Sequence, residues 1–106
     1  MKYTHKNIIG TEGLNQLLLD KQTDVRTNKL INMYITNVEE KINCIFDLVI
    51  VNKVDKYYLL KNLSIPVGAV LKLDEEDLTY DYREYDLYIT LKPRTSKLDI
   101  KLTTLL

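Results

Sequence analysis

The chain of 106 residues has no tryptophan, one cysteine, one histidine, three glycines and two prolines. Its single cysteine, Cys44, excludes an intrachain disulfide and any zinc site built from several cysteines. A catalytic thiolate would also need a histidine nearby, and the only one is His5, close to the N-terminus. The chain contains no glycine-rich phosphate loop, no Gly-x-Ser-x-Gly and no Cys-x-x-Cys. We therefore expect a protein that is not an enzyme and that carries no cofactor.

An excess of charge of either sign is also missing, because 15 lysines and arginines balance 15 aspartates and glutamates. No global field therefore attracts nucleic acid or an anionic membrane. Apolar runs such as Leu48-Val49-Ile50-Val51 are far shorter than the roughly 18 residues of a membrane-spanning helix. The N-terminal residues do not read as a secretory signal. The sequence thus predicts no nucleic-acid partner, no membrane partner and no secretion.

What the sequence does contain is a short alternation of apolar and polar residues that recurs about every ten positions. Such a period of two is typical of a half-buried β-strand. It is cleanest at residues 97–102, whereas residues 44–51 are apolar enough for a central strand covered on both faces. Residues 14–20 fit a strand but also fit a helical face through Leu14, Leu17 and Leu18. The strand candidates are residues 14–20, 29–37, 44–51, 57–63, 69–74, 85–92 and 97–102.

Seven short strands separated by turns predict an all-β chain, an antiparallel β-sandwich of about seven or eight strands. It can be immunoglobulin-like or jelly-roll-like. One domain accounts for residues 1–106, with residues 1–9 as an extended arm. Cys44 is expected to act as a small buried hydrophobe. Because alternate positions share a face, the expected core residues are Phe46, Leu48, Ile50, Leu71, Leu73, Leu87, Ile89, Ile100 and Leu102.

Acidic residues gather between Asp74 and Asp86, where seven acids stand against Arg83 alone. One interpretation is a solvated loop whose charges discourage wrong strand pairing. A calcium site is the alternative, although the segment lacks the Asp-x-Asp-x-Asp-Gly pattern of a calcium loop. The sequence leaves both interpretations open.

Four of the eight tyrosines fall within nine residues of the same region. Tyrosine is large, stiff and polar at one end, and it is frequent at protein interfaces. Cross-strand packing within the domain explains the cluster equally well. Stacking on single-stranded nucleic acid is disfavoured, because the neighbouring acids would repel phosphates. The residues that we predict for a protein interface are Tyr80, Tyr82, Tyr85, Tyr88, Glu75 and Asp77.

The run from Tyr57 to Asp74 resembles small virion proteins of tailed bacteriophages, particularly marine ones. Their pattern has a tyrosine, two leucines, a polar pair, a hydrophobe and then Ile-Pro-x-Gly, here Ile65-Pro66-Val67-Gly68. An acidic pair and a strand of the type Tyr85-Asp86-Leu87-Tyr88 come after it in that pattern. The match runs from about Leu30 to Leu91 and includes the apolar segment Leu30-Ile31-Asn32-Met33-Tyr34-Ile35-Thr36-Asn37.

This resemblance implies a sandwich domain, without catalytic residues, that decorates or cements the capsid or sits in the neck or tail. We expect a structural component of the virion that is made in the host cytoplasm. Among such components, the resemblance favours a capsid decoration protein bound to the major capsid protein. Its partners would be other virion proteins and further copies of itself. The alternatives are a neck, tail or baseplate accessory protein, or a receptor- or carbohydrate-binding module. Carbohydrate modules usually offer a tryptophan platform, which this chain lacks.

Overall fold

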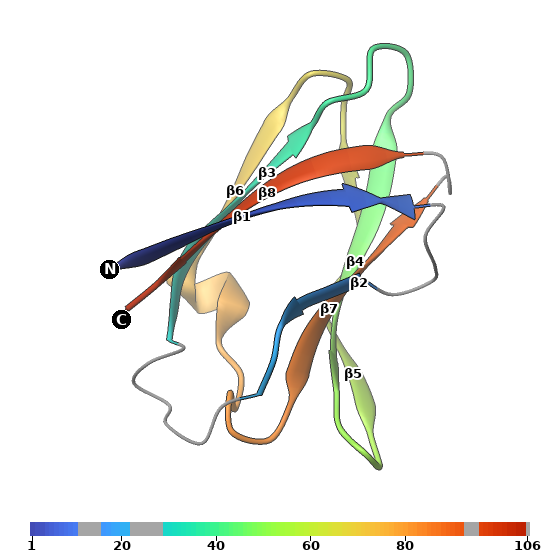
Figure 1. The fold of residues 1–106 in the computed structure, drawn as a ribbon. Helices are drawn as coiled ribbons and strands as arrows, with labels where there is room; N and C mark the ends of the chain where they lie inside the picture. The colour runs from blue at the N-terminus through green and yellow to red at the C-terminus, as the bar shows by residue number, and fades with distance from the viewer. Residues whose placement is uncertain (11–15, 22–28, 93–95, 106) are drawn as a thin grey trace.

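In the computed structural model, which describes residues 1–10, 16–21, 29–92 and 96–105, the strands form two packed antiparallel sheets (Figure 1). The strands are β1 (Lys2–Ile9), β2 (Gln16–Leu19), β3 (Leu30–Asn37), β4 (Cys44–Val51), β5 (Lys56–Ile65), β6 (Val70–Asp74), β7 (Asp86–Lys92) and β8 (Lys97–Thr104). A short 3₁₀ helix, η2 (Glu75–Leu78), lies between β6 and β7 in the chain. Within the described residues no helix is long and apolar enough to cross a membrane.

The strand order identifies the sandwich as a jelly roll. One sheet has the order β1-β8-β3-β6 and the other the order β2-β7-β4-β5. The first strand pairs with the last, β2 with β7, β3 with β6 and β4 with β5, as in one long antiparallel hairpin. Rolling this hairpin places β8 beside β3 and β7 beside β4, which closes the two four-stranded sheets. The predicted all-β sandwich is confirmed, in its jelly-roll form.

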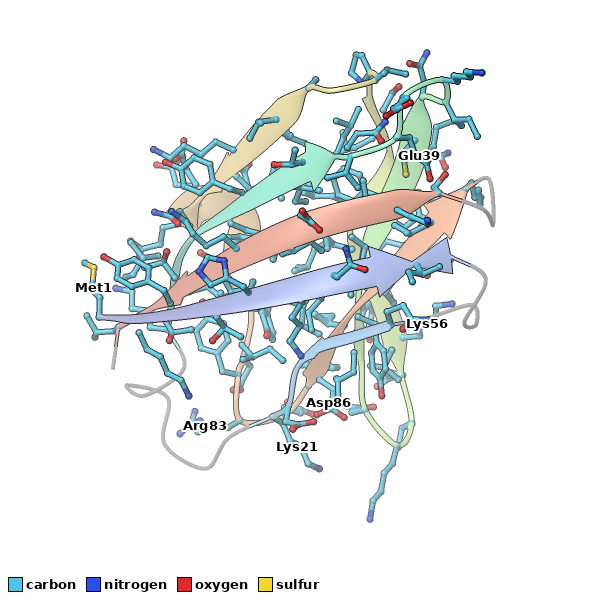
Figure 2. The ribbon with its side chains drawn as sticks, turned by 45° about the horizontal axis from the view of Figure 1, so that its top comes forward. Met1, Lys21, Glu39, Lys56, Arg83 and Asp86 are labelled. Atoms are coloured by element: carbon cyan, nitrogen blue, oxygen red, sulfur yellow. The ribbon has the colours of Figure 1, made fainter. Side chains whose placement is uncertain are left out.

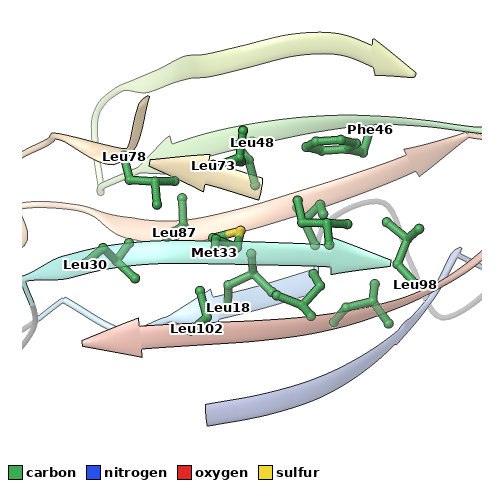
Figure 3. Close-up of a cluster of buried hydrophobic side chains, with 14 of the residues drawn as sticks. Leu18, Leu30, Met33, Phe46, Leu48, Leu73, Leu78, Leu87, Leu98 and Leu102 are labelled. Atoms are coloured by element: carbon green, nitrogen blue, oxygen red, sulfur yellow. The ribbon is translucent and has the colours of Figure 1, made fainter. Parts of the chain in front are cut away.

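The core lies between the sheets and includes buried side chains from every strand. Figure 3 shows part of this cluster, with labelled residues from β2, β3, β4, β6, β7 and β8. Leu78 from η2 is buried against the same cluster. Eight of the nine predicted core residues are buried, and Leu71 is only partly buried because β6 is an edge strand with one neighbour. Cys44 is fully buried, as predicted, and burial raises the pKa of its thiol.

The extended arm predicted for residues 1–9 is instead an edge strand of the sandwich. Strand β1 pairs with β8 at every position from Lys2 beside Thr104 to Ile9 beside Lys97. The side chain of Lys6 reaches the second sheet, where its Nζ donates to the carbonyl of Leu17 at 3.3 Å. Polar residues at the positions that share a face with the buried Ile8 hide the period of two in the sequence.

The strand interpretation of residues 14–20 is correct where it can be checked. Gln16–Leu19 forms β2, whereas Leu14 lies outside the described residues. Leu18 is buried in the core, and Leu17 lies on the opposite face of the strand. A shift in register between Leu17 and Leu19 interrupts the pairing with β7.

The buried residue Asn37 forms hydrogen bonds with two connections at one end of the sandwich, the one between β3 and β4 and the one between β5 and β6. The amide nitrogen of Asn37 donates to the carbonyls of Ile42 at 2.9 Å and Ile65 at 3.0 Å, and its oxygen accepts the Glu39 N–H at 3.0 Å. The carbonyl of Asn37 also accepts the N–H of Gly68 at 3.1 Å. Gly68 has a φ of 71°, a left-handed conformation that favours glycine in this turn.

Candidate interaction surface

Of the predicted interface residues, Tyr82 belongs to the interior, and Tyr80 is partly buried and packs against the core. Tyr82 is only 5% exposed, and its hydroxyl donates to the carbonyl of Leu78 at 3.2 Å and accepts the N–H of Leu30 at 3.3 Å. The ring of Tyr80 meets that of Tyr82 edge-on, with 4.5 Å between the centroids. Burial raises the pKa of both hydroxyls. For this pair, packing within the domain is the interpretation that the structure supports, and Tyr82 is not an exposed anchor.

The two predicted acids have partners on their own chain. Asp77 accepts the backbone N–H of Asp74 at 3.1 Å and so caps the start of η2. Glu75 forms an ion pair with Lys29 at 2.8 Å, and this contact raises the pKa of Lys29. Both members of the pair are well exposed, so its contribution to stability is small. In the part of the chain that the structure describes, no three His, Cys, Asp or Glu residues gather in a way that could hold a metal ion.

The other two predicted tyrosines lie on different surfaces. Tyr85 precedes β7, packs against the core, and meets the ring of Tyr57 edge-on at 6.0 Å. Tyr88 alternates with the buried Leu87 and Ile89, so it faces outward from the β2-β7-β4-β5 sheet. The six residues therefore do not form one surface. That Tyr80, Tyr85, Tyr88, Glu75 or Asp77 contacts a partner stays a prediction.

The outward position of Tyr88 reveals a feature that the sequence did not predict. The register places Tyr88 between Leu17 on β2 and Val49 on β4, and it places Tyr58 on β5 beside Val49. These four side chains form an apolar row across the outer face of the β2-β7-β4-β5 sheet. Leu17 is 37% exposed and Tyr58 46% exposed, whereas Val49 between them is 1% exposed. The sequence contains one signal of this surface, the apolar run Leu48-Val49-Ile50. In a strand with one solvated face, alternation would place a polar residue at position 49.

Lysines surround one end of the apolar row. The Nζ atoms of Lys61 and Lys56 lie 4.7 Å and 5.3 Å from the centroid of the Tyr58 ring. Lys92 lies beside the exposed Ile45 on the same face. Such cation–π contacts hold the ammonium groups at the edge of the patch. An apolar centre with a cationic rim complements a partner that presents acidic groups around an apolar patch.

The two acids on this face are already engaged. Asp47 is buried, and its carboxylate accepts the N–H of Asn62 at 2.7 Å, at a bulge between β4 and β5. Asp86 accepts the backbone N–H of Lys21 at 2.7 Å, near the β2 side of the sheet (Figure 2). The surface at the β5 side of the apolar row is therefore positively charged, because Lys56 and Lys61 lie beside Tyr58 there.

Comparison with known proteins adds no relative from which a role could be inferred. No family model, no curated protein and no solved structure matches the chain. A functional proposal must therefore rest on the side chains exposed on the outer faces of the two sheets.

Proposed function

We propose that this protein is a non-enzymatic structural component of a tailed bacteriophage virion, a decoration protein that binds the major capsid protein. The observation that carries the proposal is the apolar row on an outer sheet face, with its rim of lysines. The jelly-roll fold supports it, because this architecture recurs in viral capsid domains and in lectins. The resemblance of residues 30–91 to phage virion proteins supports it as well.

The proposed contact uses Tyr58 and Leu17 as exposed anchors, with Tyr88 and Val49 between them. Aromatic side chains at the centre of an interface commonly supply most of its binding energy. Lys56 and Lys61 would meet carboxylates on the capsid protein, so they would set the orientation of binding and its dependence on salt. Binding should therefore weaken as the salt concentration rises.

Mass spectrometry of purified phage particles, with copy numbers, tests the proposal directly. We expect hundreds of copies per particle, as a repeating capsid lattice would require. A few copies, set by the symmetry of a ring, would instead assign the protein to the neck or baseplate. Absence of the chain from washed particles would refute a role in the virion.

The contact itself is tested by two matched tyrosine variants. We expect Tyr58→Ala to lose affinity for particles by roughly 30-fold or more, the size of an interface hot spot, with unchanged thermal stability. Tyr3→Ala is the control, because Tyr3 is similarly exposed and also lies near a lysine, but on the other sheet. Normal incorporation of Tyr58→Ala would refute the assignment of this face. Loss of a solution dimer, with incorporation unchanged, would assign the face to a second copy of the chain instead.

A further inference from the structure

The outer face of the other sheet, β1-β8-β3-β6, contains a hollow of about 450 Å³. The strand register arranges six of its eight lining residues in two adjacent rows across three strands. His5, Lys101 and Tyr34 form one row, and Asn7, Asp99 and Thr36 form the next. All six side chains point away from the core, since they alternate with buried residues on β8 and β3. The volume falls within the roughly 300–1,000 Å³ of small-molecule sites, but the lining is mostly polar.

The carboxylate of Asp99 is oriented by its neighbour on β1. The amide nitrogen of Asn7 donates to Asp99 Oδ1 at 2.7 Å. A carboxylate has about four lone-pair sites, so Asp99 can still accept hydrogen bonds from a ligand. The amide oxygen of Asn7 and the hydroxyl of Thr36 add further hydrogen-bonding groups beside it. This half of the hollow suits a ligand with adjacent hydroxyl groups.

The other half of the hollow holds a cation between aromatic rings. The Nζ of Lys101 lies 4.6 Å from the centroid of Tyr34 and 5.7 Å from that of Tyr3. Lys72 approaches the same Tyr34 ring at 5.7 Å from β6, the strand on the far side of β3. Lys72 pairs with Asp74, but among the described residues Lys101 forms no ion pair. The ammonium group of Lys101 is therefore positioned by rings and remains available to an anionic ligand.

We propose that this hollow binds a sugar that carries a carboxylate, such as a uronic acid of a surface polysaccharide. Asp99 and Asn7 hydrogen-bond adjacent hydroxyls of the ring, and Lys101 pairs with the carboxylate. A neutral sugar would leave Lys101 without an ion-pair partner. A simple anion without hydroxyls would be repelled by the carboxylate of Asp99 and would form no hydrogen bonds with it. Because charge and hydrogen bonds hold this ligand, the site needs no tryptophan platform. The site lies on the sheet opposite the apolar row, so it does not depend on the proposed capsid contact.

Probes of matched chemistry test the proposal on the full chain, with binding followed by ¹⁵N–¹H NMR. We expect glucuronate to shift the backbone amides of β1, β8 and β3 around the hollow. Glucose, which lacks the carboxylate, and acetate, which lacks the hydroxyls, should each bind at least about tenfold more weakly. The proposal is overturned if neither glucuronate nor N-acetylneuraminate shifts amides there, or if either partial probe binds as tightly as the acidic sugar. A response to N-acetylneuraminate rather than glucuronate would keep the chemistry and change the sugar.

Single variants then assign the two halves of the site. Lys101→Met keeps the aliphatic stem and should remove the preference for glucuronate over glucose. Asp99→Ala should weaken glucuronate roughly tenfold, since it removes the acceptors for the hydroxyls. Lys61→Met is the control, because Lys61 also lies over a tyrosine ring but on the opposite sheet. Thermal unfolding checks that each variant is folded, and unchanged glucuronate affinity in folded Lys101→Met and Asp99→Ala would overturn the site.

Discussion

Replacement of Tyr82 by alanine should lower the free energy of unfolding by about 3–5 kcal/mol, the range for truncation of a buried aromatic side chain. The ring lies in the core against Tyr80, and its hydroxyl satisfies two backbone groups, the N–H of Leu30 and the carbonyl of Leu78. Tyr82→Phe keeps the ring and removes only these hydrogen bonds. We expect it to cost about 1–3 kcal/mol, because both backbone groups are then left in a buried environment. The difference between the two variants measures the packing of the ring.

Urea unfolding followed by circular dichroism gives these free energies by linear extrapolation. For a domain of this size each kcal/mol lowers the melting temperature by roughly 4 °C or more, so Tyr82→Ala should lose at least about 12 °C. Tyr58→Ala is the matched control, since its ring lies on the surface and should change stability by no more than about 1 kcal/mol. A Tyr82→Ala protein with the unfolding midpoint of the wild type would refute the core assignment. It would also make Tyr82 an interface candidate again.

Burial raises the pKa of Tyr82 and Tyr80 above the ordinary value of 10.0, so the folded chain holds these phenol protons more tightly than the unfolded chain does. The contribution of these two phenols to stability should therefore be constant below about pH 10 and be lost as the pH rises further. Tyr82→Phe should reduce that loss in urea titrations, and an alkaline profile identical in Tyr82→Phe and the wild type would contradict the assignment. Asn37→Ala should lower the free energy of unfolding by at least about 2 kcal/mol in the same assay, because the substitution removes three hydrogen bonds at a buried site. A decrease below about 0.5 kcal/mol would show that the two connections keep their structure without the Asn37 side chain. Asn62 has a φ of 57°, a left-handed conformation that alanine adopts less readily than asparagine or glycine. Asn62→Ala should therefore lower the free energy of unfolding by about 1 kcal/mol, whereas Asn62→Gly, which keeps the N–H bonded to Asp47, should not. Equal effects of the two substitutions would argue against backbone strain at this position.

Much of the fold could be predicted from local pattern alone. A strand with one face in the core must place apolar residues at every second position, and residues 97–102 and 85–92 do so without interruption. The same alternation selects Phe46, Leu48 and Ile89 as core residues, and the apolar run around Cys44 places its thiol in the interior. Strand β1 was missed, because Thr4 and Lys6 occupy inward positions near the edge of the sandwich.

The candidate sites could not be predicted in the same way. A period of two assigns each residue to a face, but it does not say which strand lies beside it. The apolar row joins Leu17, Val49, Tyr58 and Tyr88, which come from four separate segments of the sequence. The density of tyrosines between residues 80 and 88 suggested a surface, yet the turn after η2 directs Tyr82 into the core.

Alternation along the chain was thus enough to predict an all-β sandwich and the residues that most of its strands bury, because alternation is a local property. The choice between an immunoglobulin-like and a jelly-roll arrangement needed the folded chain, since it depends on pairing between distant strands such as β1 and β8. The tertiary structure also decided which outward side chains meet. Strand register across the sheets brings Lys101 to Tyr34 and Asn7 to Asp99, and no local pattern specifies that register.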